Sequence, residues 1–354
     1  MIDNSIPISI SLKPTLETEK IHSQPTPPKK RILTISGIAL LIAIVISFIA
    51  RVLVYLIDLL TNISFHGEFS IDHASPATNT LGIMVIFVPA IGGIIVGLMA
   101  LYGSKAIRGH GIPEAMEQIL TNQSKIKPSI TYLKPLSAAI SIGTGGPFGA
   151  EGPIIATGGA FGSTIGQLLK ISHNERKILL AAGATAGMSA IFGSPIAAIF
   201  LAIELLLFEF SPRSILPVAI ACITGAAGHH LLFSSEPVFA MGALIETPSN
   251  TGIGMYAVIG LIVGVLSVLV TRLVYLIEDN FEKIPIHWMW YPALGGLVVG
   301  AVGYFAPRTL GVGYDNITDV LSGSMPVQVI LSLCLLKFVS WAVALGSGTS
   351  GGTR

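Results

Sequence analysis

The segment Gly143-Thr-Gly-Gly-Pro-Phe-Gly-Ala-Glu-Gly-Pro153 lies between two apolar stretches, and the interpretation of the whole chain starts from it. Glycine leaves backbone N–H groups unshielded, and proline at a first helical position suits a helix that begins at Gly152-Pro153. A helix start carries unpaired N–H donors and the positive end of the helix dipole, so it attracts anions. If this start lies within a membrane, the segment predicts an anion-binding point at bilayer depth, with Glu151 at its mouth.

The composition favours a membrane protein. Hydrophobic residues make up 52% of the chain and charged residues 11%, whereas a soluble domain is about 25% charged. The net charge of +1 gives no sign of a nucleic-acid partner. Cys222 and Cys334 lie in apolar runs without disulfide or metal-ligand spacing, so we predict no metal and no cofactor.

The distribution of positive charge predicts the orientation. Residues 1–31 are polar and end in Lys29-Lys30-Arg31, which indicates a flexible tail. The apolar run from Ile32 is too long for a cleavable signal peptide and is long enough to span a bilayer. Basic residues cluster again over 105–134, whereas the loop 63–80 has no Lys or Arg. The positive-inside rule therefore places the tail in the cytoplasm of a cell-membrane protein and 63–80 outside.

Later apolar runs are short and interrupted by glycine and proline. Several fall below the roughly 20 residues that a full span needs. The pattern favours a transporter with discontinuous helices over an ordinary helical bundle with glycine-rich packing faces. The runs are 136–142, 154–169, 178–192, 196–208, 215–233, 254–278, 290–306 and 327–345.

The two halves of the chain repeat. Pro89–Gly97 matches Pro292–Gly300 at an offset of 203 residues. Duplicated membrane folds often have inverted topology and bring their broken helices together at mid-membrane, although these matches alone do not show inversion. We expect a first repeat at 32–245 and a second at 246–354. Further matches are Gly143, Gly145 and Gly149 with Gly346, Gly348 and Gly352, Gly109 and Gly111 with Gly311 and Gly313, and 54–58 with 274–278.

The second repeat stops early. At the offset of 203, Arg354 aligns with Glu151, so the second copy ends where its helix should begin. A half-built site would leave backbone groups unpaired in lipid. We therefore expect the second repeat to be incomplete at its C-terminus; the alternative is that another segment supplies the helices.

Three motifs in order resemble the CLC family of chloride channels and chloride/proton antiporters over residues 33–354. Gly109-His-Gly-Ile-Pro113 is similar to the first motif, usually Gly-Ser-Gly-Ile-Pro, and Gly149-Ala-Glu-Gly-Pro153 to the second, usually Gly-Lys/Arg-Glu-Gly-Pro. Gly346-Ser-Gly-Thr-Ser-Gly-Gly352 resembles the lead-in to the third, Gly-x-Phe-x-Pro. The resemblance implies an all-α polytopic membrane fold with inverted-repeat, discontinuous helices. It also implies chloride transport rather than enzymatic activity, in a homodimer embedded in lipid with one pore per subunit.

Glu151 matches the family's gating glutamate, whose carboxylate competes with the anion for the same donors. The alternative is that Glu151 only caps its helix; the cost of an intramembrane carboxylate favours the gate. His110 stands where the family usually has serine, which leaves the anion preference open. Its imidazole could donate to chloride, turn to the cytoplasmic mouth or cap the helix at Pro113. The chloride-binding residues that the resemblance implies are His110, Gly111, Gly149, Ala150, Gly152, Ile154, Gly352 and Thr353.

Leu205 occupies the position where proton-coupled members often carry an internal proton-transfer glutamate. Leucine cannot carry a proton, so the resemblance favours a chloride channel. The alternative is an antiporter with an atypical proton route, through the adjacent Glu204 or a water chain.

Two other classes of function are disfavoured. An unrelated secondary transporter also uses broken helices, but it gives no reason for Gly-Ala-Glu-Gly-Pro at the repeat. An enzyme with a phosphate-binding loop needs a preceding strand and usually a following Lys-Ser/Thr, whereas Ile154-Ile155 follows here. Lys337 lies inside an apolar run, and the sequence assigns it no role.

Overall fold

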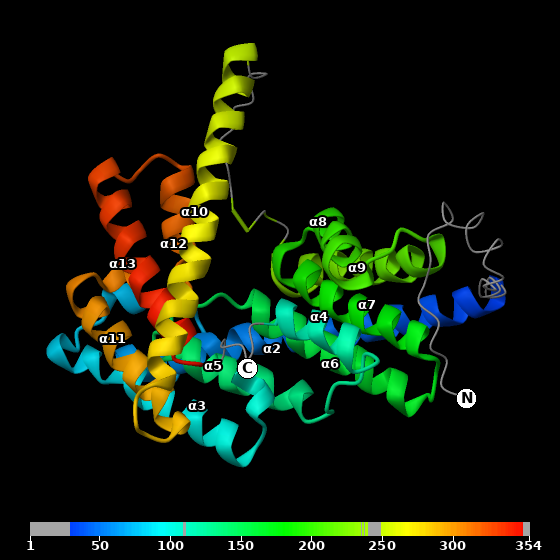
Figure 1. The fold of residues 1–354 in the computed structure, drawn as a ribbon, viewed down its shortest axis with the longest axis horizontal. Helices are drawn as coiled ribbons and strands as arrows, with labels where there is room; N and C mark the ends of the chain where they lie inside the picture. Colours follow the sequence, from blue (N-terminus) through cyan, green and yellow to red (C-terminus); the bar gives the residue numbers. More distant parts are fainter. Residues whose placement is uncertain (1–28, 109–110, 235, 237, 240–248, 350–354) are drawn as a thin grey trace. The chain divides into compact units, whose positions relative to one another are not determined.

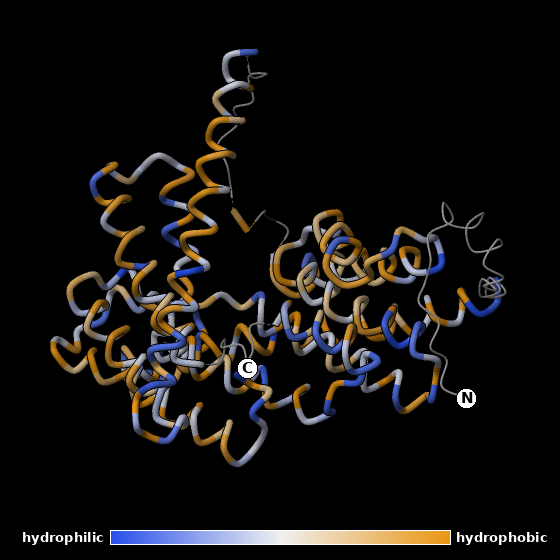
Figure 2. Tube along the Cα trace, viewed as in Figure 1, coloured by the Kyte–Doolittle hydropathy of each residue, from blue (hydrophilic) through white to orange (hydrophobic). Residues whose placement is uncertain are grey.

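The computed structural model describes residues 29–108, 111–234, 236, 238–239 and 249–349. Within those ranges the regular structure is helical, without a β-strand (Figure 1). Five helices are long and apolar enough to cross a membrane, and apolar residues run through much of α10 (Asn250–Glu282) (Figure 2). The predicted all-α polytopic membrane protein is thus confirmed. The five candidate spans are Lys29–His66, Gly82–Tyr102, Pro212–Leu232, Asn250–Glu282 and Val327–Gly346.

The chain forms two compact units, each assembled from separate stretches. The first unit holds the described residues of 1–53, 110–135 and 151–235, and the second those of 54–109, 136–150 and 236–354. Helix α2 (Lys29–Thr61) contributes to both and begins three residues before the expected start at Ile32. The two units are defined by spatial contacts and not by the internal sequence repeat. The repeat boundaries at 32–245 and 246–354 therefore stay a prediction.

The first unit is centred on the contact between α6 (Glu151–Leu168) and α7 (His173–Phe192). Gly158 and Gly183 each lie against the other's backbone carbonyl, where a Cβ atom would collide. Because glycine permits this close approach, α7 is almost wholly buried between α6 and α9 (Pro212–Leu232). The remaining elements of this unit are α4 (Ile112–Thr121), α8 (Pro195–Leu201) and a π-helical turn at Ala202–Leu207.

The second unit is built on α3 (Val88–Tyr102) and α11 (Tyr291–Phe305), the two copies of the repeated segment. Gly93 lies against the carbonyl of Pro292, and Gly296 lies against the carbonyl of Pro89. One turn further along each helix, Gly97 meets Met289 and Gly300 meets Ile86. As the residue number increases along α3, the number of the contacting residue in the second copy decreases, so the two copies pack antiparallel. The contacts are also reciprocal, as an inverted repeat requires.

The helices that flank this pair repeat the same contacts. Gly92 meets the hydroxyl group of Thr144 after α5 (Ile130–Gly143), and Gly295 meets that of Ser347 after α13 (Val327–Gly346). Likewise Gly143 contacts Ile57 of α2, and its counterpart Gly346 contacts Ile277 of α10. The offsets read from the sequence therefore correspond to equivalent contacts in space. The second unit is completed by α12 (Tyr314–Leu321) and a buried cluster of Phe65, Val85, Val299, Leu310 and Ala344.

Candidate functional site

Helix α6 begins at Glu151, at the end of the glycine-rich segment. The Glu151 side chain is partly buried, while Pro153 and Ile154 are buried. Just before the helix, the amides of Gly149 and Ala150 donate to no protein acceptor within the described ranges. Unpaired amides beside the positive end of a helix dipole attract an anion. The geometry thus supplies donors where the sequence predicted an anion site.

Gly111 of the first motif lies directly against Gly152 of the second motif, and both residues belong to the first unit. Gly111 takes a φ of +102°, and a Cβ atom there would collide with the carbonyl of Gly152. Its amide donates to Glu114 Oε2 in the first turn of α4, at 2.5 Å. A carboxylate therefore already occupies one donor that the sequence assigned to chloride. Glu114 thus caps the start of its own helix.

Three predicted chloride-binding residues, His110, Gly352 and Thr353, lie outside the described residues. Their roles stay predictions, as do those of Gly149, Ala150, Gly152 and Ile154. The meeting of the two glycine-rich arms at one anion is likewise a prediction.

The second copy of the first motif, Gly311-Val-Gly313, forms a turn before α12 with positive φ at both glycines. The Lys337 ammonium group donates to the carbonyl of Thr309 at 2.9 Å and to that of Gly311 at 2.6 Å. The Gly311 amide in turn donates to the carbonyl of Gly145 at 3.0 Å. Lys337, which the sequence left unassigned, thus secures the turn that touches the glycine-rich segment.

The lead-in to the third motif is held by Arg108, which directly precedes the first motif. Arg108 Nε donates to the carbonyl of Gly348 at 3.2 Å. Its guanidinium group also lies 5.0 Å from the ring centre of Trp288. Burial lowers the pKa of Arg108, and the negative charge of Glu278 opposes that shift.

The predicted proton-route residue Glu204 lies in the π-helical turn and is exposed, next to the partly buried Leu205. Single π-helical turns often mark functional sites. The sequence analysis missed the group beneath this turn: the buried Lys177 donates to the carbonyl of Leu207 at 3.0 Å and lies 3.7 Å from Glu209. Lys177 stands just before an apolar run, and no sequence pattern indicates that its side chain contacts a carbonyl 30 positions later in the chain.

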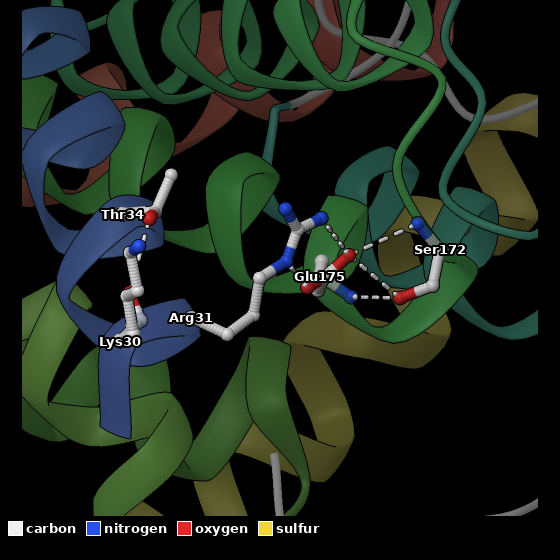
Figure 3. Close-up of polar contacts among 5 residues, drawn as sticks. All are labelled: Lys30, Arg31, Thr34, Ser172 and Glu175. Carbon is white, nitrogen blue, oxygen red and sulfur yellow. Dashed lines mark hydrogen bonds and ion pairs between the residues drawn. The ribbon is translucent and has the colours of Figure 1, made fainter. Parts of the chain in front are cut away.

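The basic end of the expected tail is anchored to α7. Arg31 donates from Nε and Nη2 to the two carboxylate oxygens of Glu175, at 2.5 and 2.9 Å (Figure 3). Glu175 also accepts from the amide and hydroxyl groups of Ser172, which forms a capping box at the helix start. The hydrogen bond from Arg31 lowers the pKa of Glu175, against the effect of burial. Residue 31 therefore belongs to the folded part rather than to a flexible tail.

The sequence profile of the voltage gated chloride channel family matches residues 91–353. Among curated proteins, the chain is 27% identical over 289 residues to the chloride channel protein CLC-f of Arabidopsis thaliana, covering 76% of this chain and 36% of that protein. It is 30% identical over 256 residues to the H(+)/Cl(-) exchange transporter ClcA of Yersinia pestis bv. Antiqua (strain Angola), covering 69% and 52%. The chain thus spans about a third to a half of the length of these two relatives.

Among solved structures, the fold is similar to a slow cyanobacterial Cl-/H+ antiporter, with a TM-score of 0.73 and 19% identity over 89% of this chain and 75% of that one. It is equally similar to a CLC-type fluoride/proton antiporter, with a TM-score of 0.73 and 19% identity over 92% and 78%. These likenesses establish the fold. The profile match over most of its length shows that the chain belongs to the voltage gated chloride channel family.

Proposed function

We propose that this membrane protein lets chloride cross the bilayer, with Glu151 as the gate. The observation that carries the proposal is the start of α6, where Glu151 follows the amides of Gly149 and Ala150, which have no acceptor among the described residues. A carboxylate and a halide compete for the same donors and the same helix dipole. Protonation of Glu151 removes its charge and leaves those donors to the anion.

A passive chloride channel is the first candidate mode. Leu205 stands where proton-coupled members often have a glutamate, and an alkyl side chain transfers no proton. Chloride/proton exchange is the second candidate, because the relative at 30% identity is named an exchange transporter. In that mode the exposed Glu204 in the π-helical turn would take up the internal proton.

The setting of the transport site follows from charge and from the family. The basic segment at Lys29–Arg31 supports a cytoplasmic N-terminus, and the loop 63–80 then faces outward. Family membership supports a homodimer in a cell membrane, with one pore per subunit.

Chloride efflux from liposomes that hold the full-length protein tests the gate. Glu151→Gln mimics the protonated carboxylate, so we expect its efflux to lose the pH dependence of the wild-type protein. Glu117→Gln, at an exposed glutamate of α4, is the matched control and should leave that dependence unchanged. Unaltered efflux and pH dependence in Glu151→Gln would remove Glu151 from the gate.

A further inference from the structure

A cavity of about 490 Å³ opens within the second unit, beside the loop that we predict to be external. Its wall is largely apolar and includes Ala150, the residue directly before Glu151. Its polar rim comes from α2, from the segment 73–78 and from the start of α12. The rim residues with charged or titratable side chains are Asp58, His73, Arg308, Tyr314 and Asp315.

His73 bridges two carboxylates on this rim. Its Nδ1 lies 3.3 Å from Asp58 Oδ1, and its Nε2 lies 3.7 Å from Asp315 Oδ1. Asp58 belongs to α2 and Asp315 to the first turn of α12, so His73 connects both helices to the loop between them in the cavity wall. A neutral imidazole has one N–H and satisfies one carboxylate, whereas an imidazolium donates to both. The arrangement therefore suits the protonated ring.

The other charged and titratable groups near His73 have partners of their own, so His73 is the group that can neutralise the charge of Asp58 and Asp315. Arg308, the other cation among the described residues of the cavity wall, forms an ion pair with Asp319 at 2.7 Å. Asp72, next in sequence, accepts from the Ser70 hydroxyl at 2.9 Å, and His66 lies 3.3 Å from the carbonyl of Ser75. The hydrogen bond to Asp58, supported by the charges of Asp58 and Asp315 and opposed by burial, raises the pKa of His73.

A metal ion does not fit this arrangement. The two ring nitrogens of one imidazole point in opposite directions, so the two carboxylates that face them cannot share one ion with His73. Within the described residues, no three His, Cys, Asp or Glu side chains gather in a way that could hold a metal. A proton is the ligand that the geometry accommodates.

We propose that Asp58, His73 and Asp315 form a proton-binding site that fastens the loop 67–75 to α2 and α12 at the rim of the cavity when His73 is protonated. The fastening is complete below the ordinary histidine pKa of about 6.5 and is lost as the pH rises through the raised value. Because Ala150 also lines the cavity, the fastening would act beside the proposed anion gate; only this last step rests on the proposed function.

Hydrogen exchange read by mass spectrometry tests the proton site without any transport. In the full-length protein in detergent, corrected for intrinsic exchange rates, peptides covering 67–78 should gain protection as the pH falls from 8.5 to 5.5. We expect His73→Gln to lose that gain and Asp315→Asn to shift its midpoint towards about 6.5. His66→Gln, in the same region but without a carboxylate partner in the described residues, is the control and should behave as wild type. The same pH response in His73→Gln and wild type overturns the proposal.

A second measurement separates the proton site from the transport function. Acid on the external side should slow chloride flux through the wild-type protein and through His66→Gln, and should slow it less through His73→Gln. Equal slowing in all three overturns the link between the cavity and the gate. A wild-type protein that carries no chloride would overturn the proposed function, and the exchange experiment would still decide the proton site.

Discussion

Lys337 shows how a single, partly buried charge can hold a turn in a membrane protein. Its side chain is partly buried, and its ammonium group donates to the carbonyls of Thr309 and Gly311. Positive φ at Gly311 and Gly313 turns the chain so that these carbonyls point inward. The lysine thus supplies donors to backbone groups that would otherwise lack a partner in lipid.

Replacing Lys337 by methionine should therefore destabilise the second unit. The variant leaves two carbonyls without their donor, and we expect the free energy of unfolding to fall by about 1–3 kcal/mol. Thermal unfolding in detergent measures the change. Lys283→Met, at an exposed lysine beyond α10, removes the same charge and should unfold like wild type. Equal stability of both variants would show that Lys337 does not hold the turn.

The ion pair between Arg31 and Glu175 predicts a particular dependence on pH. The pKa of Glu175 is lowered in the folded state, so the pair stabilises the protein fully above the ordinary glutamate pKa of about 4.3 and loses this effect as the pH falls through the folded value. Glu175→Gln should thus lower the melting temperature at pH 7 and approach the wild-type temperature in acid. Lys30→Gln removes the neighbouring charge as a control. A deficit that stays constant with pH would contradict the ion-pair account.

The residues that sequence analysis found differ physically from those that it missed. Glu151 stands out in the sequence because a carboxylate between glycines at a helix start has few structural uses in lipid, and its role as a gate stays a prediction. Lys177 and Lys337 were not, because their acceptors are carbonyls 30 and 26–28 positions away. Every residue type has the same backbone carbonyl, so no sequence pattern indicates which carbonyl a lysine will contact.

At the scale of elements, the glycines of α3 and α11 determine how the two repeats meet. The offset of 203 was visible in the sequence, but the direction of packing was not, because a matched pattern fits parallel and antiparallel neighbours alike. The reciprocal contacts of Gly93 with Pro292 and of Gly296 with Pro89 settle the direction. Side chains at either glycine would press against backbone rather than against a flexible side chain.

We therefore expect Gly93→Val and Gly296→Val to destabilise the protein by similar amounts, about 1–3 kcal/mol each or more. The reason is that both valines force the same pair of helices apart. For that reason the double variant should lose less than the sum of the two losses. Thermal unfolding of the three variants checks this. Gly260→Val, on α10 where nothing lies within 4 Å, is the control and should be tolerated. Strictly additive losses would mean that the two contacts are independent.

At the scale of the whole molecule, the proposed chloride transport has two candidate modes, in which chloride moves alone or in exchange for protons. In a channel only chloride carries the current. Its reversal potential therefore depends on the chloride gradient and does not change with a proton gradient at fixed chloride. An exchanger couples the two, so the same gradient shifts its reversal potential. The fold is common to both modes, so the difference between them lies in whether individual side chains give a proton a path.

The position of Leu205 predicts the outcome. We expect no shift of the reversal potential when a tenfold proton gradient is imposed on the full-length protein at fixed chloride. Leu205→Glu places a titratable carboxylate in the π-helical turn, and it should introduce a shift of the reversal potential if the rest of the proton path is intact. Leu205→Gln has a similar size but no titratable group, so it is the control and should introduce no shift. A shift already present in the wild-type protein would contradict the channel. In that case Glu204→Gln should abolish it, because Glu204 is the carboxylate of the same turn.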